Sequence, residues 1–234
     1  MRINKFFTDR GICSRREADR AIQAGRVSLN GFPALLGDQV KEGDVVTLDG
    51  KDVTNTHKNP VILAYNKPVG IVCTTDEHTK DNLIANVNYP ERVFNIGRLD
   101  QMSEGLLLLT NQGDIVNLIL RSRYAHEKEY VVEVQADVLD EEIEKLRKGL
   151  FIEDIRTLPC VVERMGKRRV KMILVEGKNR QIRRMMESIG HKVSRLKRVR
   201  IMHIKLDDLP SGQWRKLTKK EEEELYKKLE ISKI

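Results

Sequence analysis

Residues 95–111 read NIGRLDQMSEGLLLLTN, a crowded polar turn that runs directly into a fully apolar segment. The turn carries one aspartate, Asp100, two residues after Arg98. The apolar segment that follows is typical of a buried strand, so the carboxylate of Asp100 should lie at the rim of a core. An aspartate at such a place is either a structural turn residue or a reactive group, and the pattern alone favours the structural role.

Strand and helix signals alternate on both sides of this segment, which predicts an α+β domain. Strands are expected at residues 61–65, 70–74, 106–110, 130–134 and 171–175, and helices at 114–120 and 139–146. A further helix should begin at Asn179 as its N-cap and end at Gly190. Residues 218–221 form a capping box that opens a charged surface helix at the C-terminal end.

The N-terminal block has helix, turn and strand signals of its own. Residues 14–17 form a capping box, Gly25 stands where a helix C-cap glycine belongs, and Asn30-Gly31 is a hairpin turn pair. The apolar pattern lapses through residues 51–59 and resumes at Val61. We therefore expect a small α/β domain at residues 1–50, a linker at 51–59 and a larger domain at 60–234.

Composition favours a nucleic-acid partner. Among the 234 residues, 43 Lys and Arg stand against 35 Asp and Glu, a net charge of +8, and aromatic residues make up only 5%. Three widely spaced cysteines fit neither a disulfide framework nor a zinc site. Since no apolar run has the length of a signal peptide core or a membrane span, we expect a cytoplasmic protein without membrane contact. No heptad seam is visible, so a monomer is expected.

Motifs for cofactor chemistry are missing from the sequence. No stretch matches a phosphate-binding GxxxxGK[ST] loop, a dinucleotide fingerprint or an HExxH zinc helix. The five histidines, at positions 57, 78, 126, 191 and 203, lack the spacing of metal ligands. We therefore expect neither a cofactor nor a metal.

Four motifs in order resemble those of bacterial ribosomal-RNA pseudouridine synthases of the RsuA/RluB/RluE/RluF branch. The catalytic-loop motif is matched by GRLD at residues 97–100 with SEGL at 103–106 and LTN at 109–111. The others are matched by NKP at 66–68, HEKEY at 126–130 and EGKNRQIRRM at 176–185. Residues 198–202 and 209–215 are most similar to the RluF subfamily, which acts on large-subunit ribosomal RNA. The N-terminal block resembles the RNA-binding domain of ribosomal small-subunit protein four.

This resemblance implies a catalytic domain with a mixed or antiparallel β-sheet and flanking helices, preceded by the small RNA-binding domain. It also implies that a uridine is isomerised by cleavage of its N-glycosidic bond, rotation of the uracil and rejoining through carbon, with no cofactor. Asp100 would start the reaction in its ionised form, by attacking the ribose or the base or by assisting glycosidic cleavage. The uridine must be single-stranded or flipped out of its helix.

Three other residues are implied in the reaction. Arg183 would pair with Asp100, although an arginine in this basic helix can also contact phosphate or face solvent. Arg98 would lie around the flipped nucleotide or else anchor the loop. Tyr130 would stack on the target base, although a tyrosine in a strand is otherwise usually part of the core.

RNA contacts are expected along the basic stretches. Residues 178–200 hold nine Lys or Arg against one acid, Glu187. Such a density suits phosphate binding without reading sequence. In the larger domain the resemblance assigns RNA contacts to Arg98, Leu99, Gln101, Lys178, Arg180, Gln181, Arg183 and Arg184. In the small domain the basic surface consists of Lys5, Arg15, Arg16, Arg20 and Arg26.

The expected partner is structured ribosomal RNA that contains the target uridine, with transfer RNA as a second candidate. A non-catalytic RNA- or ribosome-binding protein is the alternative, because the N-terminal block and the basic stretches alone would support it. A DNA-binding regulator would account for the charge but not for the four motifs.

Overall fold

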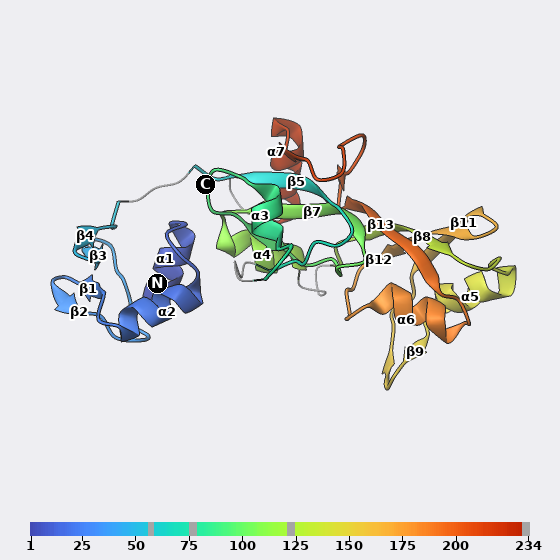
Figure 1. Cartoon of the computed structure of the whole chain (residues 1–234), viewed down its shortest axis with the longest axis horizontal. Coiled ribbons are helices and arrows are strands. Elements are labelled where there is room, and N and C mark those ends of the chain that lie inside the picture. The colour runs from blue at the N-terminus through green and yellow to red at the C-terminus, as the bar shows by residue number, and fades with distance from the viewer. Residues whose placement is uncertain (56–58, 75–78, 121–124, 231–234) are drawn as a thin grey trace. The chain divides into compact units, whose positions relative to one another are not determined.

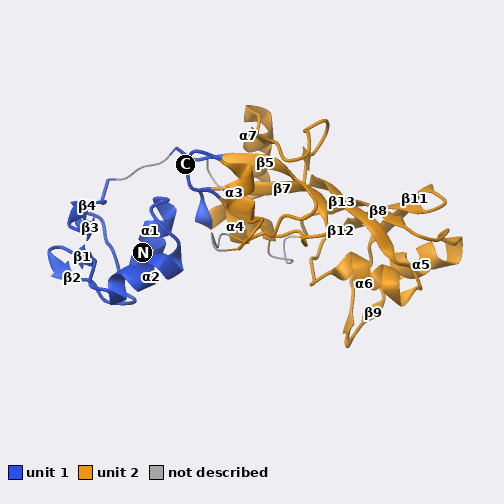
Figure 2. Ribbon diagram, in the orientation of Figure 1, with its two compact units in different colours: residues 1–61, 89–93, 111–113 blue, residues 62–88, 94–110, 114–234 orange. Residues whose placement is uncertain are grey.

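The computed structural model describes residues 1–55, 59–74, 79–120 and 125–230. The chain divides into two compact units, one made of residues 1–61, 89–93 and 111–113 and the other of residues 62–88, 94–110 and 114–234 (Figure 2). Expectations for His57, His78 and the linker positions 56–58 fall outside the described residues. None of the helices among the described residues is long and apolar enough to cross a membrane.

The first unit packs two short helices on a small sheet (Figure 1). Its elements are α1 (Ile3–Asp9), α2 (Arg15–Gln23), β1 (Val27–Leu29), β2 (Phe32–Pro33), β3 (Val46–Leu48) and β4 (Lys51–Asp52), with the antiparallel strand order β2-β1-β3-β4. The core contains the edge-to-face ring pair Phe6 and Phe7, with apolar residues of α2 and the strands around it. Ser14 forms the predicted capping box with Glu17, and Gly25 has the positive φ of +66° expected of a C-cap glycine.

Residues 51–54, which the sequence pattern places in the expected linker, bond and pack within the first unit. Lys51 and Asp52 pair with β3, Val53 packs against the core of this unit, and the Thr54 hydroxyl accepts from the backbone N–H of Val46. Their polar side chains broke the apolar pattern, but backbone hydrogen bonds continue the hairpin through these residues.

The second unit is built on a mixed nine-stranded sheet with helices packed against it (Figure 1). The strand order is β11-β12-β8-β13-β7-β5-β15, with β14 added to β13 and β6 to β7. The strands are β5 (Ile62–Lys67), β6 (Phe94–Ile96), β7 (Glu104–Thr110), β8 (Lys128–Val134), β11 (Val161–Gly166), β12 (Arg169–Leu174), β13 (Val193–Ile201), β14 (Ile204–Lys205) and β15 (Trp214–Lys216). Only the pairing of β13 with β7 is parallel among these described strands.

The remaining elements are the helices α3 (Leu83–Val87), α4 (Gly113–Leu120), α5 (Asp140–Lys148), α6 (Gln181–Ser188) and α7 (Lys219–Lys228), and the two-stranded ribbon of β9 (Phe151–Ile152) and β10 (Ile155–Arg156). Two apolar clusters serve the two halves of the sheet. One joins β5 and β7 to α4 and α7, and the other joins β8, β12 and β13 to α5 and α6.

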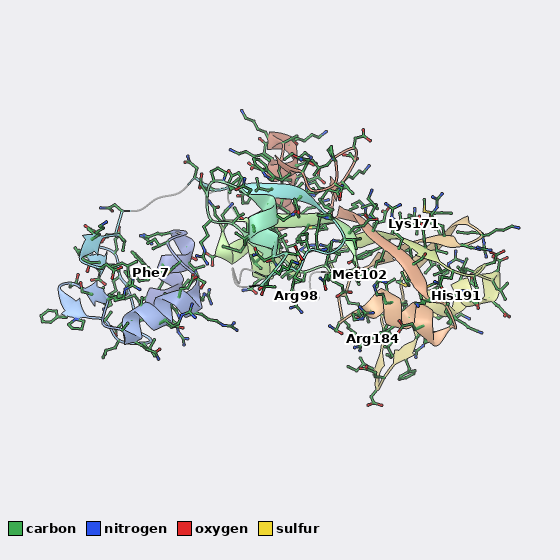
Figure 3. All side chains as sticks on the ribbon, viewed as in Figure 1. Phe7, Arg98, Met102, Lys171, Arg184 and His191 are labelled. Atoms are coloured by element: carbon green, nitrogen blue, oxygen red, sulfur yellow. The ribbon has the colours of Figure 1, made fainter. Side chains whose placement is uncertain are left out.

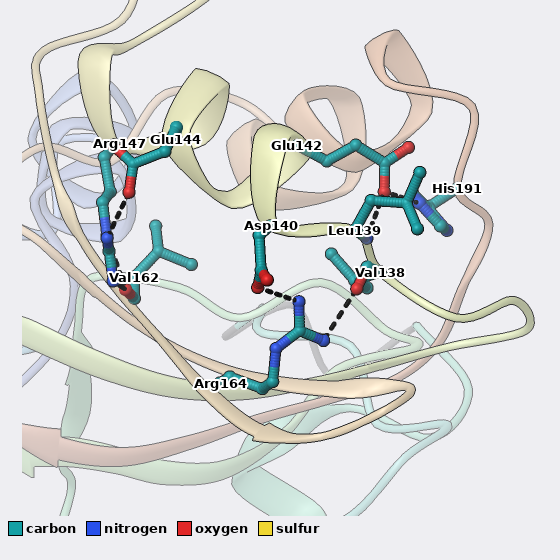
Figure 4. A network of polar contacts seen from close by, with 9 residues as sticks. All are labelled: Val138, Leu139, Asp140, Glu142, Glu144, Arg147, Val162, Arg164 and His191. Carbon is teal, nitrogen blue, oxygen red and sulfur yellow. Dashed lines mark hydrogen bonds and ion pairs between the residues drawn. The ribbon is translucent and has the colours of Figure 1, made fainter.

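Arginines tie α5 to the outer strand β11 (Figure 4). Arg164 donates to the carbonyl oxygen of Val138 at 2.7 Å and to the Asp140 carboxylate at 2.6 Å, while Arg147 donates to the carbonyl oxygen of Val162. In the first turn of α5, the Glu142 carboxylate accepts from the N–H of the N-cap residue Leu139 and contacts His191 at 2.9 Å. These bonds hold α5 against the outer strand β11.

Sequence prediction of these elements was uneven. The capping box at Thr218 and Glu221 opens α7 as expected, and β5, β7, β8, β12, α4 and α5 lie within two residues or so of their predicted positions. A strand at residues 70–74 was wrong, since only Val72 forms an isolated bridge there, to Asn82. Asn179 is not the N-cap of α6: Arg180 holds that position with a φ of 49°, and the Asn179 side chain accepts from Arg184.

Candidate active site around Asp100

The Asp100 turn connects β6 to β7 and is fixed by its backbone. The Ser103 N–H donates to the Asp100 carbonyl oxygen at 3.0 Å. Gln101 closes a pair of bonds with the loop after β5: its carbonyl oxygen accepts from the Gly70 N–H at 2.8 Å, and its side-chain amide donates to the Gly70 carbonyl oxygen at 3.0 Å. Leu99 is buried beneath the turn. The carboxylate is therefore carried on a braced loop rather than on a freely moving one.

Lys67 supports the turn from one side. Its side chain is fully buried, and Nζ donates to the carbonyl oxygens of Pro68 and Ser103, both at 2.8 Å, and of Gln101 at 3.4 Å. Burial lowers the pKa of the Lys67 ammonium, while the charges of nearby groups, Asp100 among them, oppose that shift. Sequence reasoning gave this residue no role beyond its motif, although a lysine that ends a strand of otherwise uncharged, mostly apolar residues is a detectable signal.

Arg183 supports the turn from the other side. Its helix α6 is amphipathic, so Ile182, Met185 and Met186 are buried and the guanidinium is carried to the sheet. Nη2 donates to the Met102 carbonyl oxygen at 2.7 Å and to the Ser103 hydroxyl at 3.3 Å, and Nη1 donates to the Val193 carbonyl oxygen at 3.3 Å. Burial lowers the pKa of Arg183, as does Arg180, and the charge of Asp100 opposes this.

The expected ion pair between Arg183 and Asp100 is not formed in this structure. Instead, the arginine bonds to backbone and hydroxyl oxygens of the same turn. The Asp100 carboxylate is half-buried and makes no hydrogen bond or ion pair with any residue that the structure describes. A carboxylate that lies within electrostatic range of two buried cations and is not hydrogen-bonded to either is free to meet a ligand.

Tyr130 is brought to the same region by strand register. Glu104 and Gly105 at the start of β7 pair with Lys197 and Arg198 of β13, and Arg198 in turn lies opposite Tyr130 of β8. The guanidinium of Arg198 lies 6.0 Å from the centre of the Tyr130 ring, and its Nε donates to the Leu106 carbonyl oxygen at 2.7 Å. Tyr130 is thus separated from β7, the strand that follows Asp100, by β13 alone.

Gly105 permits this close strand pairing. A Cβ at this position would lie 2.2 Å from the carbonyl oxygen of Arg198, and the backbone φ is +102°. A residue with a side chain would push β13 away from β7, so the glycine sets how near Arg198 lies to the turn.

The expected RNA-contacting residues of the second unit differ in exposure. Arg98, Gln101 and Arg180 are exposed, and Figure 3 shows Arg98 and Arg184 on the second unit. Leu99, Gln181 and Arg183 are buried, with exposed fractions of 7%, 4% and 7%. Gln181 bonds instead to Glu176 at 2.6 Å and to the Lys178 N–H at 3.0 Å.

Some of the basic side chains that are expected to contact RNA form ion pairs within the protein. Lys178 pairs with Glu176 at 3.2 Å and Arg184 with Glu153 at 2.9 Å. In the first unit, Lys5 pairs with Asp9 and Arg26 with Asp49. Of the five basic residues expected to contact RNA there, Arg15, Arg16 and Arg20 are exposed and have no ion pair with any described residue.

Two family models match the chain. Residues 61–188 match the family model of the RNA pseudouridylate synthases, and residues 1–46 match that of the S4 domain. The chain is 47% identical over 233 residues to the dual-specificity RNA pseudouridine synthase RluF of Escherichia coli K12, covering 99% of the chain and 80% of that protein.

Two further likenesses cover nearly all of the chain. It is 33% identical to the ribosomal large subunit pseudouridine synthase B of Bacillus subtilis, over 93% of the chain and 92% of that protein. A crystal structure of a pseudouridylate synthase matches 96% of the chain and 99% of its own chain with a TM-score of 0.71 at 28% identity. The chain belongs to the RNA pseudouridine synthase family, of the type represented by RluF, and is an isomerase that acts on RNA.

Proposed function

We propose that this enzyme isomerises a specific uridine of ribosomal RNA to pseudouridine, with Asp100 as its catalytic carboxylate. The observation that carries the proposal is the state of that side chain: it stands on a braced turn, within electrostatic range of the buried cations Lys67 and Arg183, and has no hydrogen-bond partner of its own among the described residues. Nearby cations favour the ionised form of the Asp100 carboxylate, and because they do not bond to it, the carboxylate can react with a substrate.

The reaction needs no group beyond such a carboxylate. The bond between N1 of uracil and C1′ of ribose breaks, a bond between C5 and C1′ forms, C5 loses a proton and N1 gains one. The atoms of substrate and product are therefore the same. Asp100 either bonds covalently for a time to the ribose or base or assists cleavage of the glycosidic bond, and both routes use the ionised carboxylate.

The target base must reach Asp100 from an RNA helix. We propose that it is flipped out and stacks on Tyr130, while the exposed Arg98 contacts the flipped nucleotide. The register supports this, because Tyr130 lies opposite Arg198, which lies opposite Gly105 of the strand that follows Asp100, and adjacent strands are about 4.8 Å apart. The residues up to about 50, followed by a linker, would act as a separate RNA-positioning domain.

Large-subunit ribosomal RNA is the first candidate substrate, and transfer RNA the second. Support comes from the names of the relatives, one a ribosomal large subunit synthase and the other a dual-specificity enzyme. The S4 domain at residues 1–46 adds a second RNA-binding element.

Primer extension after carbodiimide modification tests the proposal. Purified protein is incubated with unmodified large-subunit, small-subunit and transfer RNA, alongside Asp100→Asn and the control Asp81→Asn. Asp81 is exposed and has a φ of 55°, which asparagine tolerates. A new stop should appear with the parent and the control but not with Asp100→Asn. Full activity of Asp100→Asn would contradict the catalytic role, and a stop in transfer RNA alone would contradict the ribosomal substrate.

A further inference from the structure

Buried basic side chains outnumber buried carboxylates among the described residues of the second unit. Four lysine or arginine side chains are buried among the described residues, Lys67, Lys128, Arg183 and Arg198, with exposed fractions of 0%, 8%, 7% and 4%. Among the same described residues, the only buried carboxylate is that of Glu176, which pairs with Lys178 and bonds to Gln181. Buried charges in proteins are normally paired, because water no longer stabilises them.

The four buried cations all bind neutral oxygen atoms. Lys67 donates to three backbone carbonyls, and Arg183 to two carbonyls and a hydroxyl. Lys128 donates to the His126 carbonyl oxygen at 3.0 Å, and Arg198 to that of Leu106 at 2.7 Å. For Lys67 and Arg183 these bonds brace the Asp100 turn, which accounts for their burial.

Neither Lys128 nor Arg198 bonds to the Asp100 turn: Lys128 donates to His126, and Arg198 donates to Leu106 on β7. The Nη2 atom of Arg198 is buried and has no hydrogen-bond partner in the part of the chain that the structure describes. Burial lowers the pKa of Lys128, and the charge of Arg198 lowers it further, so two like charges lie within electrostatic range of each other with no carboxylate bonded to either. An anion would relieve both the unpaired donor and the repulsion.

The position of this pair fits the substrate. Arg198 lies opposite Tyr130 in the β8–β13 ladder, with its guanidinium 6.0 Å from the centre of the ring. Its backbone packs on Gly105, so it also adjoins the strand that follows Asp100. A nucleotide whose base meets Tyr130 and whose ribose meets Asp100 would bring its own phosphate, or the next one, close to Arg198.

We propose that Arg198, supported by Lys128, forms an anion subsite that receives an RNA phosphodiester at or next to the target uridine. A guanidinium suits this ligand, because its N–H groups match two phosphate oxygens at once. The subsite would hold the flipped nucleotide by its backbone and so help to keep the base out of the helix. The inference rests on the proposed function in one respect, that Asp100 and Tyr130 face the target nucleotide.

Neutral linkages in the RNA test this directly. The substrate is the RNA stem-loop that the protein protects from ribonuclease, made in versions that each carry one uncharged methylphosphonate linkage. Affinity is measured by filter binding, which needs no turnover, and kcat and KM are measured on the same RNAs. For the parent, one linkage near the target uridine should weaken binding about tenfold or more, the usual effect of losing a charge-assisted hydrogen bond.

The variants assign that effect to a residue. Arg198→Met should bind unmodified RNA more weakly by a similar factor and should be insensitive to that linkage, whereas Arg198→Lys should keep part of the sensitivity. Lys128→Met provides a second variant if Arg198→Met does not fold. The matched control is Arg200→Met: Arg200 lies on the same strand but is paired with Glu129 at 2.9 Å and Glu127 at 3.0 Å. The control should respond to the linkage as the parent does.

The inference is overturned if folded Arg198→Met and Lys128→Met keep the full response of the parent, or if no single linkage matters to the parent. A parent that binds RNA with the expected linkage effect but makes no pseudouridine would overturn the role of Asp100 and not this subsite.

Discussion

The ammonium of Lys67 reaches from the end of β5 to the carbonyl oxygen of Ser103, 2.8 Å away, at the start of β7. The hydroxyl of the same serine accepts from Arg183 at 3.3 Å, and Ser103 is only 1% exposed. Two buried cations therefore hold the Asp100 turn through its backbone and through Ser103. The position of the carboxylate depends on these bonds and not on an ion pair of its own.

Removing the Lys67 ammonium should loosen the turn. In Lys67→Met the volume is kept, but the carbonyl oxygens of Pro68 and Ser103 lose their donor, so we expect a loss of about 1–3 kcal/mol in unfolding free energy and a lower kcat. Urea denaturation and single-turnover kinetics measure the two effects. Lys80→Met is the control, because Lys80 is exposed and its replacement should change stability by less than about 0.5 kcal/mol. Equal stability of the two variants would contradict the bracing role.

A side chain at Gly105 should separate β13 from β7. The Cβ of Gly105→Ala would lie 2.2 Å from the Arg198 carbonyl oxygen in a backbone with φ of +102°, so a loss of about 2–4 kcal/mol is expected. Gly177→Ala is the matched control, since its Cβ would meet no atom within 4 Å. Thermal and urea unfolding compare the two, and a Gly105→Ala protein as stable as Gly177→Ala would show that the strands can move apart at little cost.

Stability at low pH should depend on Glu221. Bidentate hydrogen bonds from Arg215, together with the Thr218 N–H at the start of α7, lower the pKa of this carboxyl to about 2 from 4.5. A carboxyl whose pKa is lowered on folding stabilises the fold at pH values above its pKa in the unfolded chain. That contribution is lost as the pH falls from 4.5 towards 2. Glu221→Gln should therefore be less stable near pH 7, by at most about 3 kcal/mol, with a flatter pH dependence below pH 5.

Urea unfolding at a series of pH values measures this effect. Glu223→Gln is the control because Glu223 is exposed on the same helix. A Glu221→Gln protein whose stability falls with acid as steeply as that of the parent would assign the acid sensitivity to other carboxylates.

RNA affinity should depend on the exposed arginines of α2 and on salt. Arg15, Arg16 and Arg20 have no ion pair with a described residue, so each is available to a phosphate. Replacing all three by alanine should reduce the slope of log affinity against log salt by about 2–3, while kcat at saturating RNA stays the same. Lys219, Lys220 and Lys227, exposed on α7, provide a charge-matched triple control. An unchanged slope would mean that this face of α2 does not meet RNA.

Much of the architecture follows from local signals in the chain. Local signals depend on residues a few positions apart, as in the capping boxes at Ser14 and Thr218, the apolar run of β7 and the apolar stripe of α6. These elements formed as predicted, except that the N-cap of α6 is Arg180 and not Asn179. The four motifs and their order likewise identified the family, which the comparisons confirm. The pattern of residues 193–201 concealed a central strand, because charged residues interrupt its apolar positions.

Tertiary structure decided which of the many basic residues gather at Asp100. Arg183 bonds to Met102, 81 positions away, and Arg198 to Leu106, 92 positions away. The same structure buried Leu99 and Gln181, which the motifs had placed in contact with RNA. The sequence determined the elements and the motif residues because their signals act between chain neighbours. Long-range contacts such as the pairing of β13 with β7 bring distant segments together, and these contacts determine which cations are buried around the Asp100 turn.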